Sequence, residues 1–187
     1  AQAGTLQAAY MAPTEILAKQ HFESFIKLFE HFPIAIGLIT GSGCYKFPSK
    51  LNKDKVTNIS RAQLLKWVAN GEISVLIGTH ALIQKSVQFK HLALVVIDEQ
   101  HRFGTAQRRA LTRRSGEVRL PHLLSMTATP IPRTLALTIY GDLDLTLLNQ
   151  MPPGRKPIIT EVVKPSARTQ AYEKIRTQLA EGRQAYV

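Results

Sequence analysis

Short apolar runs alternate with amphipathic stretches along most of the chain. Five runs have the length and composition of buried strands: residues 6–11, 34–39, 73–77, 92–97 and 123–126. Two of the intervening stretches carry apolar residues at three- and four-residue spacing, as amphipathic helices do. One helix is predicted to begin after Thr14, and a second to begin after Ser60 and end at Gly71. This pattern predicts an α/β fold, in which crossover helices join the strands of a parallel sheet and cover both of its faces.

Small and polar residues follow every one of these runs. The five groups are Ala12-Pro13-Thr14, Thr40-Gly41-Ser42, Gly78-Thr79-His80, Asp98-Glu99-Gln100-His101 and Thr127-Ala128-Thr129. The carboxyl ends of parallel strands meet at one edge of the sheet, where loops and helix N-termini present backbone N–H groups to anions. The five groups together predict a ligand-binding edge.

The chain is predicted to change character near residue 150. Three prolines and one glycine stand within residues 151–157, and such a stretch disfavours both helices and central strands. We therefore expect a first domain over 1–150, a linker over 151–157 and the beginning of a second domain over 158–187. That beginning is predicted to hold a strand at 158–163, a helix capped by Ser166 and a further strand at 184–187. The polar, Lys-rich segment 45–59 is predicted to be a loop.

Composition narrows the class of protein. With 187 residues, 44% of them hydrophobic, the chain can bury a full core, and it has no apolar run near the ~20 residues that cross a bilayer. Its single cysteine, Cys44, excludes an internal disulfide and fits a reducing compartment, so we expect a cytoplasmic protein without a membrane partner. The formal net charge of +11 favours a polyanionic partner such as nucleic acid, and six arginines fall within residues 102–119.

Two adjacent carboxylates carry the most specific chemistry. Asp98 and Glu99 follow a buried run directly, and a bound cation would relieve their desolvation and mutual repulsion. In nucleotide hydrolysis the first carboxylate of such a pair holds Mg²⁺ and the second deprotonates the attacking water. From these residues alone, a solvated turn that caps a helix is an alternative. A metal-dependent nuclease is another, although it would need further carboxylates and acidic residues are sparse.

Longer segments around these residues resemble known helicase motifs. Residues 95–104, VVIDEQHRFG, resemble motif II of superfamily 2 helicases, and residues 124–135, LSMTATPIPRTL, resemble motif III. The amino-acid sequences of these two motifs are similar to those of the RecG family of bacterial branch-migrating DNA helicases. Residues 11–18, 40–42 and 78–81 resemble motifs Ia, TxGx and Ib of that family. The resemblance implies a RecA-like motor lobe that uses ATP and Mg²⁺ and acts on forked or branched DNA during repair and recombination, at the nucleoid of a bacterial cell.

The same resemblance implies roles for individual residues. Asp98 would coordinate Mg²⁺, through water, and Glu99 would be the general base. Gln100 and His101 would couple the nucleotide to motif III, where Thr127, Ala128 and Thr129 would transmit its state to the DNA. Contacts to DNA phosphates are implied for Pro13, Thr14, Thr40, Gly41, Ser42, Gly78, Thr79 and His80. Without the family context, a helix cap and a tight turn explain Thr14 and Gly41-Ser42 equally well.

One element of the family pattern is missing. ATP hydrolysis needs a GxxxxGK loop followed by Ser or Thr, and none of the eleven glycines here precedes a lysine. We therefore expect the phosphate loop, the DNA-engaging wedge domain and most of the second motor lobe to lie elsewhere in the parent protein. These 187 residues alone are then predicted not to hydrolyse ATP. Segment 43–58 is longer than the usual family connection. A Mfd-type transcription-repair coupling translocase and a non-catalytic nucleic-acid-binding module remain alternatives.

Overall fold

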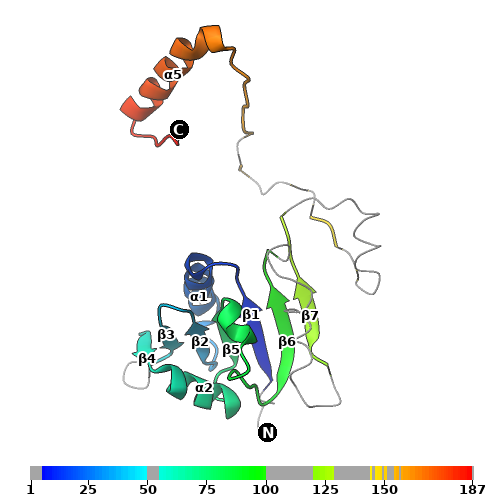
Figure 1. The fold of residues 1–187 in the computed structure, drawn as a ribbon. Coiled ribbons are helices and arrows are strands. Elements are labelled where there is room, and N and C mark those ends of the chain that lie inside the picture. Colours follow the sequence, from blue (N-terminus) through cyan, green and yellow to red (C-terminus); the bar gives the residue numbers. More distant parts are fainter. Residues whose placement is uncertain are drawn as a thin grey trace. The chain divides into compact units, whose positions relative to one another are not determined.

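A computed structural model describes residues 6–49, 55–99, 120–128, 144, 146–148, 150, 154–155 and 157–186. The chain divides into two compact units, Ala1–Ile139 and Tyr140–Val187. Within the described residues, the first unit contains a seven-stranded sheet in the order β4-β3-β2-β5-β1-β6-β7 (Figure 1). The strands are β1 (Gln7–Met11), β2 (Ile36–Ile39), β3 (Cys44–Phe47), β4 (Thr57–Ile59), β5 (Val75–Gly78), β6 (Leu92–Ile97) and β7 (His122–Ser125).

Five of these strands form the predicted parallel sheet. β2 pairs with β5, β5 with β1, β1 with β6 and β6 with β7, all in parallel. Each strand lies on one of the apolar runs, so the predicted α/β class is confirmed. The burial explains the composition of the runs, because all four residues of β2 and all four of β5 are buried.

The segment predicted to be a loop over 45–59 instead contains two strands at its ends, so that prediction is wrong there. β3 pairs antiparallel with β2, and β4 pairs antiparallel with β3, which makes the sheet mixed. In β3 only the two end residues, Cys44 and Phe47, are buried. β3 has four residues and β4 has three, and the pattern of strands this short is too weak to be predicted from the chain, because pairing with neighbouring strands is what stabilises them.

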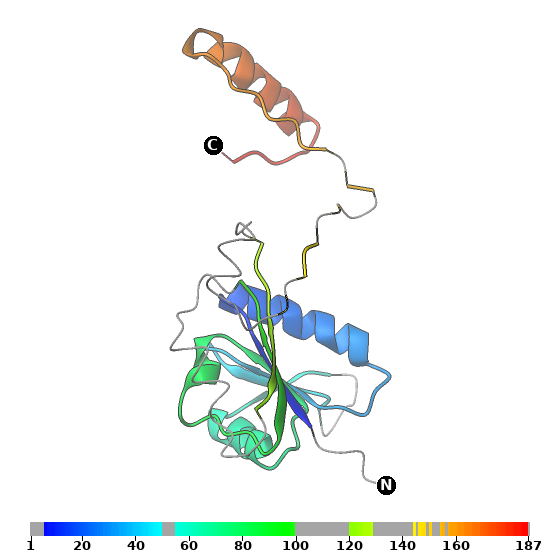
Figure 2. The same cartoon turned by 90° about the vertical axis from the view of Figure 1, so that its right-hand side faces the viewer.

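Helices cover the two faces of the sheet (Figure 2). α1 (Glu15–Phe29) packs on one face with Tyr10 and Ala12, while α2 (Arg61–Ala69) and the short 3-10 helix η1 (His80–Ile83) pack on the other. Both predicted helix starts are confirmed. The Thr14 hydroxyl accepts the Leu17 N–H at 3.3 Å, and the Ser60 hydroxyl accepts the Gln63 N–H at 3.2 Å.

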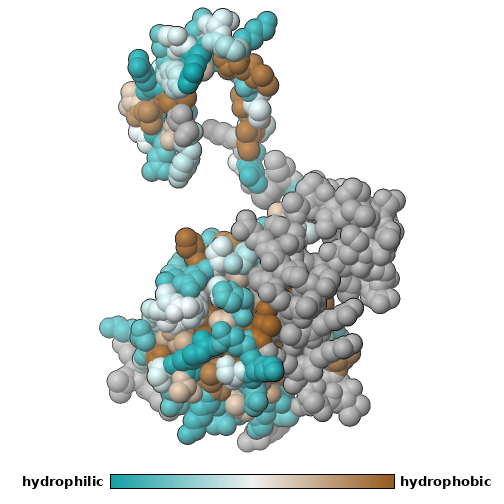
Figure 3. Space-filling view, in the orientation of Figure 1, coloured by the Kyte–Doolittle hydropathy of each residue, from teal (hydrophilic) through white to brown (hydrophobic). Residues whose placement is uncertain are grey.

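Gly71 follows α2 with a φ of 79°, in the left-handed region that favours glycine, as the predicted end of that helix requires. The described surface of the first unit seen in Figure 3 interleaves hydrophilic and hydrophobic side chains. Singly exposed apolar residues such as Ile16 are ordinary on a protein surface. None of the helices in the described part of the chain has the length and hydrophobicity needed to cross a membrane.

One buried polar residue, Gln7, ties several elements together. Its side-chain Nε2 donates to the carbonyl oxygens of Val68 at 2.9 Å and Ile73 at 2.8 Å. Its Oε1 accepts the N–H groups of Lys90 at 2.8 Å and His91 at 3.1 Å. Gln7 is 2% exposed and begins β1, so it joins that strand to the end of α2 and to the entry of β6.

The second unit contains a 3-10 helix, η3 (Pro165–Ala167), and α5 (Arg168–Ala180). The helix was predicted, but its cap is Ala167 without a side-chain hydrogen bond, so the predicted Ser166 cap is wrong. The predicted strand at 158–163 is also wrong, and residues 184–186 likewise have no strand conformation. A strand needs a partner for its backbone groups, and the described part of this unit supplies none. Most of the predicted linker, residues 151–153 and 156, lies outside the described residues.

Candidate functional site

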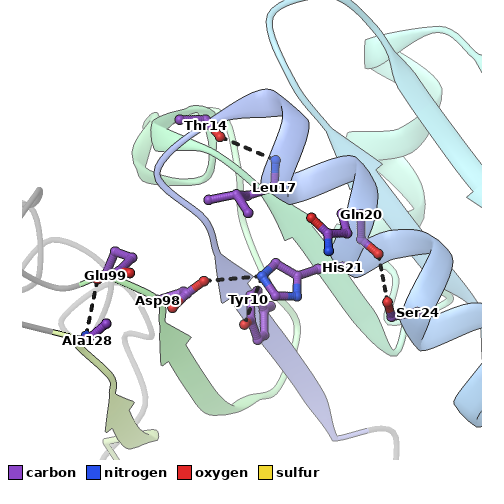
Figure 4. Close-up of polar contacts among 9 residues, drawn as sticks. All are labelled: Tyr10, Thr14, Leu17, Gln20, His21, Ser24, Asp98, Glu99 and Ala128. Carbon is purple, nitrogen blue, oxygen red and sulfur yellow. Dashed lines mark hydrogen bonds and ion pairs between the residues drawn. The ribbon is translucent and has the colours of Figure 1, made fainter. Parts of the chain in front are cut away.

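The candidate carboxylates lie where three strands end together. The Asp98 N–H, directly after β6, donates to the Met11 carbonyl oxygen of β1 at 2.9 Å. On the other side, Ile97 of β6 is in register with Ser125 of β7, and the Met126 N–H donates to the Ile97 carbonyl oxygen at 2.9 Å. The parallel pairing therefore places the start of segment 98–101 beside the start of segment 127–129 (Figure 4).

Glu99 makes the contact between these two segments. Its Oε2 accepts the Ala128 N–H at 3.4 Å, a long hydrogen bond. Its backbone has a φ of 50°, a conformation that costs a residue other than glycine on the order of 1–3 kcal/mol. Such strain is frequent at functional sites, where neighbouring contacts hold it in place. Thr127 is exposed beside this contact. Gln100, His101 and Thr129 lie outside the described residues.

Asp98 contacts His21, a residue that is not among the predicted site residues. Its Oδ2 lies 3.2 Å from Nε2 of His21 on α1, and the Tyr10 hydroxyl lies 3.4 Å from the same nitrogen. Burial, and secondarily the negative charge of Asp98, raise the pKa of Tyr10 to about 12. The sequence could have indicated this contact only through the position of His21, on the face of α1 that carries the buried Ala18 and Phe22. A histidine at such a position is explained equally well by packing.

The carboxylate of Asp98 is of a chemical type that can hold a hydrated magnesium ion. The Asp98 side chain is 21% exposed, so it borders solvent at the sheet edge. Among the described residues there is no group of three or more His, Cys, Asp or Glu side chains able to hold a metal. Magnesium commonly takes one or two carboxylates and completes its shell with phosphate oxygens and water. A nuclease-type carboxylate cluster does not fit the described part of this edge.

The Thr40-Gly41-Ser42 turn binds an anion within the chain. The N–H groups of Gly41 and Ser42 donate to Oε1 of Glu15, at 2.8 and 3.2 Å. Hydrogen bonding from the Ser42 side chain, followed by these N–H groups and Lys19, lowers the pKa of the Glu15 carboxyl. The turn thus presents its N–H groups to an anion, which in this structure is the carboxylate of Glu15.

The other predicted DNA contacts differ in exposure. Thr14 and His80 are exposed, Pro13 is half-buried, and Thr40 and Thr79 are buried. Gly78 is also buried, and a Cβ atom there would lie 2.5 Å from the Ile39 carbonyl oxygen. Close packing of β5 against β2 therefore requires glycine at this position, whatever the ligand.

The chain is similar to known helicases along nearly all of its length. The family model described as DEAD/DEAH box helicase matches residues 1–138. The ATP-dependent DNA helicase RecG of Synechocystis is 46% identical over 184 residues, covering 98% of this chain and 20% of that protein. The Bacillus subtilis RecG is 45% identical over 181 residues (97% and 24%), and that of Escherichia coli O157:H7 is 43% identical over 182 residues (96% and 24%). The chain thus spans between a fifth and a quarter of these curated relatives.

Solved structures give the same result for the fold. The structure of RecG bound to a three-way DNA junction matches with a TM-score of 0.71 and 40% identity, over 94% of this chain and 21% of that chain. S. cerevisiae Dbp5 bound to RNA and ADP BeF3 matches with a TM-score of 0.50 and 20% identity, over 75% of this chain and 34% of that one, which supports the fold alone. The predicted RecA-like helicase lobe and the resemblance to RecG are confirmed. The chain belongs to the DEAD/DEAH box helicase family.

Proposed function

We propose that the chain contributes the metal-binding and water-activating side of the ATPase site in a RecG-type DNA helicase. The observation that carries this proposal is the contact of Glu99 with the Ala128 N–H, which joins the two helicase motifs at the carboxyl edge of the sheet. The relatives at 43–46% identity are named ATP-dependent DNA helicases, which favours this function over a transcription-repair coupling translocase.

In this proposal ATP would bind at the carboxyl edge together with Mg²⁺, and Asp98 would be the residue that holds the ion. The ion would neutralise charge on the phosphates. Glu99 accepts a proton from the attacking water, and its contact with the Ala128 amide orients its carboxylate. Gln100 and His101 couple the nucleotide to Thr127, Ala128 and Thr129, which transmit its state towards the DNA.

DNA would bind through its phosphates at the neighbouring loops. Thr14, Gly41, Ser42 and His80 are exposed there, and a phosphate would replace the Glu15 carboxylate on the N–H groups of Gly41 and Ser42. Pro13, Thr40, Gly78 and Thr79 would shape these loops and present backbone groups, with little reading of bases. The formal charge of +11 supports a polyanionic partner, and the RecG structure with a three-way junction supports a branched or forked one. The parent would then remodel stalled forks and recombination intermediates in the bacterial cytoplasm, at the nucleoid.

The same proposal assigns parts of the chain to the domains of the parent protein. Residues 1–150 would belong to the first motor lobe, 151–157 to a linker and 158–187 to the beginning of the second lobe. The phosphate loop, the wedge domain and the remainder of the second lobe would come from other parts of the same protein. Without a phosphate loop to hold the triphosphate, these 187 residues alone would not hydrolyse ATP.

Phosphate release tests this proposal directly. In the whole protein with forked DNA, Glu99→Gln should lower DNA-stimulated turnover by about 100-fold or more, as loss of a general base does. Glu30→Gln, at the exposed C-cap of α1, is the matched control and should retain the wild-type rate. Unchanged turnover in Glu99→Gln would refute the catalytic assignment. Turnover by the 187-residue chain alone, abolished by the same substitution, would refute its predicted inactivity.

Salt dependence tests the DNA-binding part separately. If phosphate contacts dominate, the logarithm of the affinity should fall linearly with the logarithm of the salt concentration, by roughly one unit of slope per phosphate neutralised. Fluorescence anisotropy with a labelled fork measures this slope. A flat response would count against the phosphate-contact loops.

A further inference from the structure

His21 joins α1 to the end of β6 across a separation of 77 residues in the chain. Its Nε2 lies 3.2 Å from Oδ2 of Asp98, with side chains that are 27% and 21% exposed. Figure 4 shows the imidazole between the Asp98 carboxylate and the Tyr10 hydroxyl. Neither His21 nor Tyr10 belongs to the residues that the helicase motifs assign to the nucleotide or to the DNA.

The chemistry of the two partners determines where the imidazole proton lies. An ionised carboxylate only accepts hydrogen bonds, so the contact is attractive only if Nε2 of His21 carries a proton. The Tyr10 oxygen, 3.4 Å from that nitrogen, is then a second acceptor for the same N–H. With the proton on Nδ1 alone, Nε2 and Oδ2 would face each other as two acceptors.

Aromatic packing holds the imidazole in this orientation. The ring of His21 lies 4.7 Å from the ring of Tyr10, and Phe25 packs edge-on against Tyr10 at 5.4 Å. Tyr10 is 8% exposed and lies in β1, which pairs with β5 on one side and with β6 on the other. His21 therefore reaches Asp98 from α1 and packs against a buried residue of β1. Side chains supported by a helix and a strand in this way are held in one geometry.

We propose that His21 is a positioning residue for Asp98, holding Oδ2 so that the remaining carboxylate oxygen faces the cation of the nucleotide site. That remaining oxygen has no hydrogen-bond partner among the described residues, and the proposal rests on the assignment of Asp98 to Mg²⁺ made above. Hydrogen bonds to metal-binding carboxylates orient them, and their loss commonly lowers metal affinity 10- to 100-fold. An imidazole that served packing alone would be replaceable by an apolar side chain of similar size.

The first test locates the proton in the 187-residue chain by NMR of the ¹⁵N-labelled imidazole. A proton on Nε2 supports the proposal, and a proton on Nδ1 alone overturns it. Because this measurement uses the unmodified chain, it does not depend on whether a variant folds.

The second test measures Mn²⁺ binding to the whole protein by electron paramagnetic resonance, with a non-hydrolysable ATP analogue present. His21→Leu should weaken Mn²⁺ binding by about 10-fold or more. His21→Gln, whose amide can donate from nearly the same place, should recover most of the loss. His21→Asn is polar but too short to reach Oδ2, and it should behave like His21→Leu. The control is His31→Leu, since His31 is 86% exposed, and it should match wild type.

The outcomes separate the two proposals. Wild-type affinity in His21→Leu, or equal losses in His21→Gln and His21→Leu, overturns the positioning role while the proposed function stands. A wild-type protein that binds no Mn²⁺ with the nucleotide analogue overturns both.

Discussion

Replacing Gln7 by methionine should destabilise the fold strongly while nearly preserving the shape of the side chain. The four hydrogen bonds of Gln7 would be lost, and two carbonyl oxygens and two N–H groups of Val68, Ile73, Lys90 and His91 would lose their side-chain partner. A net contribution of about 0.5–1.5 kcal/mol per bond gives roughly 2–6 kcal/mol in total. Domains are stable by only about 5–15 kcal/mol, so the variant is expected to lose a large share of its free energy of unfolding.

Urea denaturation followed by tryptophan fluorescence measures this loss. The chain has a single tryptophan, Trp67, whose carbonyl oxygen accepts the N–H groups of Glu72 and Ile73 beside the contacts of Gln7. Gln20→Met, at an exposed position of α1, is the control and should change the free energy of unfolding by less than about 0.5 kcal/mol. A loss below about 1 kcal/mol in Gln7→Met would show that these buried hydrogen bonds contribute little to stability, contrary to the prediction.

Gln7→Glu adds a test in which pH changes the outcome. The introduced carboxyl group can still accept the N–H groups of Lys90 and His91, but when ionised it repels the carbonyl oxygens of Val68 and Ile73. Burial and these carbonyls favour its protonated form, so its pKa in the folded state should exceed that in the unfolded state. The variant should therefore be most stable at acidic pH and lose stability as pH rises through the folded-state pKa. Stability that rises with pH, relative to wild type, would contradict this account.

Three further predictions concern the sheet edge. Gly78→Ala should lower the free energy of unfolding by about 1–3 kcal/mol or more in the same assay, because the new methyl group would lie 2.5 Å from the Ile39 carbonyl oxygen of β2. Wild-type stability in this variant would contradict the packing argument. The raised pKa of Tyr10, about 12 against an ordinary 10.0, corresponds to about 3 kcal/mol of stability that is fully present below pH 10 and lost as pH rises through 12. Tyr10→Phe should remove this alkaline loss, measured by denaturation between pH 9 and 12, and an unchanged pH profile would assign the loss to another group. Glu15→Gln should speed amide hydrogen exchange at Gly41 and Ser42 severalfold at pH 7, because the ionised carboxylate that accepts both N–H groups is lost. In wild type, the protection of these two amides should persist until the pH falls below 4.5 and through the lowered pKa of Glu15. Equal exchange rates in the two proteins would show that the carboxylate does not hold the turn.

Local patterns were sufficient to predict the parallel strands, the starts of α1 and α2, and the residues of the sheet edge. An apolar run, an N-cap hydroxyl and a glycine in the left-handed region each depend on only a few neighbouring residues. Their effects can therefore be predicted from the order of the amino acids. Local patterns also placed residues 98–99 and 127–128 directly after strands, whereas the roles predicted for them came from the resemblance to helicase motifs. Parallel pairing of β6 with β7 explains why these residues meet. The fold class, the family and the edge that carries the candidate site could therefore be predicted from residues that are neighbours in the chain.

The hydrogen-bond partners of these residues come from segments that are distant in the chain and become known only from the folded structure. His21 meets Asp98 over 77 residues, Gly41 meets Glu15 over 26, and Gln7 joins segments between 61 and 84 residues away. The antiparallel strands β3 and β4 form because β2 offers an edge, and no strand forms at 158–163, where the described residues offer none. Hydrogen bonds and strand pairs need two partners in contact, and a local pattern along the chain describes only one of them.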